Sequence, residues 1–123
     1  MEQKKKKILI ADDDLGILDA VMMFLEEFDY EVEITDDGGT LHEFPHGYPD
    51  LLLLDIWMSG WNGCDICLQL KQQEATKYLP IILFSANKDT AKIAKEAGAD
   101  DFLTKPFEMD DLLAKVAHHL GCD

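Results

Sequence analysis

Short apolar runs alternate along the chain with longer segments whose apolar residues repeat at helical spacing. The short runs are rich in leucine, isoleucine and valine, as strands of a buried sheet are. They occupy residues 7–11, 30–35, 50–55, 80–86 and 101–105. The helical pattern occupies residues 14–28, 64–73, 89–98 and 108–121. The pattern therefore predicts strands and helices that alternate through the whole chain.

One connection departs from this alternation. The segment "DGGTLHEFPHGYPD" at 37–50 has room for only a turn or two of helix, because Pro45 interrupts helical hydrogen bonding. Alternating strands and helices predict a parallel sheet covered on both faces. The expected fold is α/β, a flavodoxin-like doubly wound (βα)5 three-layer sandwich with the sheet order 2-1-3-4-5.

Acidic residues follow two of the predicted strands. The run "LLLLDIW" ends its apolar part at Asp55, and "ILIADDD" leads into Asp12 and Asp13. In the expected sheet the carboxyl ends of the first and third strands flank the point where the strand order reverses. Carboxylates about 4 Å apart repel by roughly 4 kcal/mol at an effective dielectric of about 20, so a proton or a cation must accompany them. An all-oxygen ligand set favours Mg²⁺ or a related ion.

Each candidate residue also has an ordinary structural interpretation. Asp12 to Asp14 are suited to cap the following helix, and Asp55 is suited to a turn after a strand. Ser85 in "LFSA" fits a small loop residue, and Lys105 in "TKPF" fits a solvated lysine. A site is favoured because all four positions fall at the carboxyl ends of predicted strands.

Composition limits the class of protein. The 123 residues, 47% of them hydrophobic, suit one domain spanning 1–123 with no separate output domain. The formal net charge of −14 and the lack of arginine make nucleic acid and anionic membrane poor direct partners. The apolar stretch after "KKKK" is too short for a signal peptide or a membrane span, so a cytoplasmic location is expected. Cys64 and Cys67 are expected to be reduced and to pack in the core, and the four histidines are expected to be solvated.

Taken together, the motifs resemble those of a known family. They are Asp12-Asp13 after "ILIA", Asp55 before "MSGWNG", Ser85 after "IILF", and "GADDFLTKPF" with Lys105. In this order they resemble the receiver domain of bacterial two-component response regulators, of the stand-alone CheY-like kind. The resemblance extends over essentially the whole chain.

The resemblance implies an acceptor and a metal site. Asp55 would be the phospho-acceptor, because a carboxylate oxygen is the nucleophile that forms an aspartyl phosphate. Asp13, with Asp12 acting through water, would hold Mg²⁺ together with Asp55 and the backbone carbonyl of Trp57. The phosphoryl group would come from a sensor histidine kinase or a histidine phosphotransfer protein.

The resemblance also implies a switch. Lys105 and Ser85 would each contact a phosphoryl oxygen, Lys105 as a point charge. The movement of Ser85 toward Asp55 would let Phe102, the switch aromatic residue, turn inward. The helix at about 88–97, the fifth strand and the helix at about 107–120 would then form the face that binds a downstream target protein.

Some residues near the predicted site need separate mention. The bond from Lys105 to Pro106 is cis in the family, so it is expected to be cis here. Ser59 stands where the family usually has proline. Trp57 and Asn87 would shield the phosphoryl group from water or orient a water toward it, which leaves the lifetime of the phosphorylated state open.

Two other functions fit parts of the sequence. A receiver that is never phosphorylated would act as a constitutive docking module. A small Mg²⁺-dependent phosphatase of the haloacid dehalogenase type would use Asp12 and Asp14 as its D-x-D motif and Asp100-Asp101 as its late acidic pair. The order of motifs disfavours the phosphatase, because its lysine should precede the acidic pair, whereas Lys105 follows it.

Overall fold

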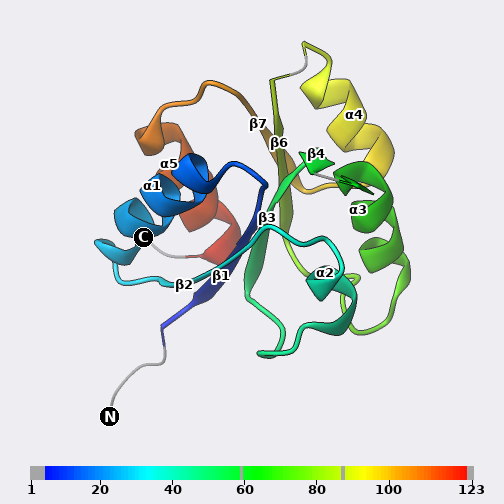
Figure 1. Ribbon diagram of the computed structural model, residues 1–123, viewed down its shortest axis with the longest axis horizontal. Coiled ribbons are helices and arrows are strands. Elements are labelled where there is room, and N and C mark those ends of the chain that lie inside the picture. The colour runs from blue at the N-terminus through cyan, green and yellow to red at the C-terminus, as the bar shows by residue number, and fades with distance from the viewer. Residues whose placement is uncertain (1–4, 59, 87, 122–123) are drawn as a thin grey trace.

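A parallel sheet between two layers of helices forms the body of the protein (Figure 1). The structure, a computed structural model, describes residues 5–58, 60–86 and 88–121. The sheet has the strand order β2-β1-β3-β6-β7. Its strands are β1 (Lys7–Ala11), β2 (Glu31–Thr35), β3 (Leu51–Asp55), β6 (Ile81–Ser85) and β7 (Asp101–Thr104). The predicted fold and the order 2-1-3-4-5 are confirmed, since β4 and β5 lie outside this sheet.

The helices cover both faces of the sheet. They are α1 (Leu15–Glu26), α2 (Thr40–Glu43), α3 (Gly63–Gln72), α4 (Thr90–Ala97) and α5 (Met109–Leu120). Figure 1 shows α1 and α5 on one side and α2, α3 and α4 on the other. Side chains alternate along β3, so Leu51 and Leu53 pack toward the first layer while Leu52 and Leu54 pack toward the second. The leucine run is thus explained by a strand that is buried on both faces.

Local signals set the helix ends close to where the sequence predicts them. The side chain of Asp14 accepts hydrogen bonds from the N–H groups of Gly16 and Ile17 at 3.0 and 3.2 Å, which caps α1. Helix α4 ends at Gly98, whose φ of 77° is the left-handed conformation that glycine adopts without strain. As expected, α2 is a single turn before Pro45.

A short hairpin after β3 was not predicted from the sequence. Strands β4 (Trp57–Met58) and β5 (Trp61–Asn62) pair antiparallel in the segment "WMSGWN". Met58 is 5% exposed and packs into the core, which holds one side of the hairpin. Two-residue strands carry too short a pattern to be recognised by periodicity.

The cysteine prediction is confirmed for the described residues. Cys67 is fully buried in the core, and Cys64 packs at its edge. Burial raises the pKa of the Cys67 thiol to about 12, which keeps it protonated and unreactive. Within the described part of the chain, none of the helices has the length and apolar character needed to cross a membrane.

Candidate functional site

Three carboxylates meet at the carboxyl edge of the sheet. Asp12 directly follows β1, and Asp55 ends β3, whose register with β1 places Leu54 opposite Ala11. Oxygen atoms of Asp12, Asp13 and Asp55 all lie within 4.8 Å of one another. Asp12 is fully buried and Asp55 is 5% exposed, whereas Asp13 is exposed. The predicted meeting of these acids is therefore present in the structure.

Lys105 reaches into this cluster from the end of β7. Its ammonium nitrogen lies 3.0 Å from Asp12 Oδ2 and 3.6 Å from Asp55 Oδ1. Its backbone N–H donates to the carbonyl oxygen of Ser85 at 2.8 Å, which holds the loop beside β6. The Lys105–Pro106 peptide bond is cis, as the resemblance implies. One ammonium is thus shared by two buried carboxylates.

The electrostatics of Asp55 reflect this crowding. Burial, followed by the negative charge of Asp12, raises the pKa of the Asp55 carboxyl to about 7. Lys105 and the backbone N–H of Trp57 lower it without compensating fully. Near neutral pH the Asp55 carboxyl therefore holds a proton for part of the time. A cation at this point would displace the proton, so the oxygen-only donor set and its uncompensated charge fit a hard divalent ion such as Mg²⁺.

Asp12 and Asp14, two of the three consecutive aspartates, have different structural roles. Asp14 caps α1, so the capping interpretation holds for it. Asp12 instead accepts from the N–H of Asp14 at 2.9 Å while its other oxygen faces Lys105. The D-x-D motif of the phosphatase alternative would need Asp14 in the site. That alternative also fails because Asp101 begins β7, so Asp100 and Asp101 lie at the opposite edge of the sheet from Asp55.

An open cavity lies in front of Asp55. It has a volume of about 420 Å³ and is lined by Asp55, Trp57, Ser85, Ala86 and Lys105. Ser85 ends β6 and is 3% exposed, while the Trp57 side chain is 61% exposed at the rim. The N–H of Trp57 donates to Asp55 Oδ1 at 3.4 Å, so the hairpin backbone contacts Asp55 directly. The predicted residues Ser59 and Asn87 lie outside the described residues.

Phe102 lies on β7 and is not among the residues that line this cavity. It packs against the core layer that includes α4, and the Lys115 ammonium lies 5.4 Å from the centre of its ring. Its neighbour Asp101 accepts from Lys115 Nζ at 2.7 Å and pairs with His119 Nε2 at 2.9 Å. The expectation that the histidines are solvated is therefore wrong for His119. No local sequence signal identifies this pair, because 18 residues separate its members.

Fold and site together define a receiver of the two-component type, and the comparisons with known proteins agree. The family model described as "Response regulator receiver domain" matches residues 8–117. The chain therefore belongs to the response regulator receiver domain family.

Individual relatives support the same assignment. The chain is 39% identical to the response regulator ArlR of Staphylococcus saprophyticus, over 89% of this chain and 50% of that protein. It is 32% identical to the DNA-binding response regulator MtrA of Mycobacterium tuberculosis, over 98% of this chain and 53% of MtrA. Among solved structures, the chemotaxis response regulator CheY4 of Vibrio cholerae superposes with a TM-score of 0.85 at 28% identity, over 95% of this chain and 100% of CheY4.

These relatives correct one expectation. The chain spans about half the length of the curated relatives it matches. MtrA is a DNA-binding response regulator. The expectation that nucleic acid is a poor partner, which rested on the net charge of −14, is therefore not supported for proteins of this class. Net charge describes the receiver surface and carries no information about another domain in the same protein.

Proposed function

We propose that this receiver domain accepts a phosphoryl group on Asp55 from a sensor histidine kinase or a histidine phosphotransfer protein. The observation that carries the proposal is the cluster of Asp12, Asp13 and Asp55, together with a cavity that is lined by Asp55, Lys105 and Ser85. These side chains come from the carboxyl ends of four strands: β1, β3, β6 and β7. The 123 residues act as one receiver unit in this proposal.

Asp55 is the nucleophile in the proposed reaction. One of its carboxylate oxygens attacks phosphorus, the phosphorus–nitrogen bond of the donor phosphohistidine breaks, and the bonding electrons stay on the imidazole nitrogen. The attack needs the ionised carboxyl, although burial raises the pKa of Asp55 to about 7. Mg²⁺, held by Asp13, Asp55 and the Trp57 carbonyl and by Asp12 through water, would supply the positive charge that favours this ionised form.

Lys105 and Ser85 complete the site. The Lys105 ammonium already lies 3.6 Å from Asp55 Oδ1, close enough to pair with an oxygen of a phosphoryl group on that carboxylate. Ser85 lines the same cavity from β6, where its hydroxyl is suited to donate to another phosphoryl oxygen. Lys105 therefore needs no large movement to bind the product.

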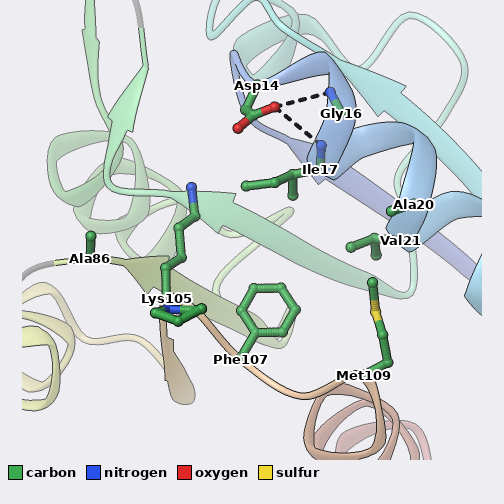
Figure 2. A pocket seen from close by; sticks show the side chains of 10 residues that line it. Asp14, Gly16, Ile17, Ala20, Val21, Ala86, Lys105, Phe107 and Met109 are labelled. Carbon is green, nitrogen blue, oxygen red and sulfur yellow. Dashed lines mark hydrogen bonds between the residues drawn. The ribbon is translucent and has the colours of Figure 1, made fainter.

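A second cavity suits the incoming donor. It measures about 560 Å³ and lies between α1 and the start of α5, with Ala86 and Lys105 in the lining of both cavities. Figure 2 shows the Phe107 ring at its centre, with Ile17 and Met109 beside it. Apolar lining that is continuous with the acceptor site is what a helix carrying a phosphohistidine would need in order to dock. We therefore assign this cavity to the phosphodonor.

The proposed output is a change at the face formed by α4, β7 and α5. A phosphoryl group adds about −1.5 to −2 charges, and its hydrogen bond to Ser85 would draw the end of β6 toward Asp55. Phe102, which pairs with Leu83 of β6 in the sheet register, would respond by turning inward. A downstream target protein would bind the altered face.

Intact-mass spectrometry tests the proposal. The protein is incubated with Mg²⁺ and a small phosphodonor, beside Asp55→Asn and a matched Asp50→Asn control at the opposite edge of the sheet. We expect wild type and Asp50→Asn to gain one phosphoryl group and Asp55→Asn to gain none. If wild type gains none from either the small donor or a phosphorylated donor protein, the constitutive docking module is the better assignment.

A further inference from the structure

Trp61 of the hairpin packs on a stretch of backbone that has no side chain. A Cβ atom added to Gly38 would lie only 2.5 Å from Trp61 Cγ and 2.9 Å from Trp61 Cβ. The φ angle of Gly38 is not in the left-handed region, so its backbone does not itself require glycine. Gly38 is also buried. The indole of Trp61 therefore explains why position 38 lacks a side chain.

This contact joins two segments that are far apart in the sequence. Gly38 lies in the turn between β2 and α2, and Trp61 lies in β5 of the hairpin. Within the hairpin, Trp61 pairs with Met58 and Asn62 pairs with Trp57. A shift of Trp61 would therefore be transmitted to the backbone of Trp57 through two residue pairs.

The hairpin needs such an anchor. Isolated two-stranded hairpins are at best marginally stable, and these strands have only two residues each. At its far end the segment is held by the N–H of Gly63, which donates to the carbonyl oxygen of Ile56 at 2.6 Å. Gly63 cannot carry a side chain either, since a Cβ there would collide with the carbonyl oxygen of Asp55. This hydrogen bond lies within the hairpin segment, whereas Trp61 connects the hairpin to the neighbouring turn through its contact with Gly38.

We propose that Trp61 is a positioning residue for the cation site, acting through Gly38. By packing on Gly38 it holds the hairpin, and with it the main chain of Trp57, beside Asp55. This inference rests on the proposed function, in which the Trp57 carbonyl is a Mg²⁺ ligand. The β2–α2 turn thereby becomes part of the support of the metal site, although none of its residues lines the acceptor cavity.

Mg²⁺ titration calorimetry on four single variants tests the proposal. Residues that orient a metal ligand usually cost 10- to 100-fold in affinity when replaced, so we expect Trp61→Ala and Gly38→Ala to weaken Mg²⁺ binding roughly tenfold. Gly39→Ala is the matched control at the neighbouring position, because its Cβ would lie at an ordinary 3.6 Å from the Trp61 ring and its closest contact, at 3.2 Å, would be with Asp37 Oδ1 at the end of a side chain. Tyr78→Ala controls for loss of an exposed aromatic side chain far from the site. Both controls should bind Mg²⁺ as wild type does.

The double variant Trp61→Ala/Gly38→Ala separates this contact from general damage. Once the indole is gone, alanine at position 38 no longer collides with Cγ and Cδ2, and of those contacts only the one with the Cβ of residue 61 at 2.9 Å stays. The double variant should therefore bind Mg²⁺ little more weakly than Trp61→Ala alone. Additive losses would overturn the proposal. So would unchanged affinity in both single variants when circular dichroism shows that they are folded.

Amide hydrogen exchange keeps this test independent of the proposed function. Without metal, exchange at the Gly63 N–H should be faster in Trp61→Ala than in wild type, because the hairpin loses its contact with Gly38. If wild type bound no Mg²⁺, the proposed metal site would fail, and faster exchange would still support the role of Trp61 in holding the hairpin. Unchanged exchange would refute that role even if wild type bound Mg²⁺ tightly.

Discussion

The two edges of the sheet contain the same residue types in opposite electrostatic conditions. At the amino edge, Asp100 Oδ2 accepts from Lys71 Nζ at 2.6 Å and from the N–H of Ile81 at 2.8 Å. At the carboxyl edge, Asp12 and Asp55 share the single ammonium of Lys105. Asp100 thus has a lysine of its own, whereas Asp12 and Asp55 must share one.

The pKa directions show the same difference. Burial would raise the pKa of Asp101 at the amino edge, but hydrogen bonds from Lys115, His119 and the N–H of Phe102 lower it below its ordinary value. The pKa of Asp55 is raised to about 7, by burial first and by the charge of Asp12 second. Acids at the amino edge stabilise the fold, while those at the carboxyl edge retain a charge that a ligand can neutralise.

The largest expected effect comes from removing the shared cation. Lys105→Met keeps much of the side-chain volume but leaves buried Asp12 and Asp55 without their ammonium. Because an unpaired buried charge is costly, we expect the free energy of unfolding to be about 3 kcal/mol lower than that of wild type. Urea denaturation at pH 8 without metal measures this difference. Saturating Mg²⁺ should recover part of this loss. A variant as stable as wild type without metal would show that Lys105 does not offset the acid cluster.

The amino edge should respond to loss of an acid rather than loss of a cation. Asp100→Ala removes the acceptor of Lys71 Nζ and of the N–H of Ile81, and we expect a loss of about 2 kcal/mol in stability. Mg²⁺ should not restore it, since the carboxylate cluster is at the other edge. Chemical denaturation with and without Mg²⁺ measures both. Recovery on adding Mg²⁺ would contradict the distinction drawn between the edges.

The smallest expected effect is a gain in stability. The pKa of Asp55 is about 7 in the folded protein against an ordinary 3.8, so the folded state holds this proton more tightly. The stability of the metal-free protein should therefore fall as pH rises through this range. Asp55→Asn cannot ionise, and after allowance for solvent screening we expect it to be more stable than wild type by roughly 1 to 2 kcal/mol at pH 8.

A second pH value checks the cause of this gain. At pH 5 wild-type Asp55 is already protonated in the folded state, so most of the advantage of Asp55→Asn should disappear. Urea unfolding with a chelator at both pH values measures the difference. An equal gain in stability at both pH values would show that the gain comes from packing rather than from the charge of Asp55.

Much of the candidate site was predictable because parallel strands bring their carboxyl ends together. Asp12 and Lys105 are 93 residues apart in the chain, yet each directly follows a strand that the apolar pattern identifies. Once strand order 2-1-3-4-5 is expected, their meeting with Asp55 follows from topology. The roles of Ser85 and Phe102 depend on the family resemblance and stay predictions.

Other features were not predictable because they depend on contacts between remote side chains. The contact of Trp61 with Gly38 and the pair of Asp101 with His119 leave no periodic signal in the sequence. The sequence likewise left open which of Asp12, Asp13 and Asp14 would cap α1, since any of three adjacent acids can cap a helix.

The sequence by itself determined the strands, the main helices and their order, because apolar periodicity and cap residues are local properties. It also determined that Asp12, Asp13 and Asp55 would meet at the carboxyl edge. Only the tertiary structure decided which aspartate caps α1, which carboxylates share Lys105, and what holds the hairpin beside Asp55. Those outcomes depend on distances of a few ångströms between segments that become neighbours only when the core has packed.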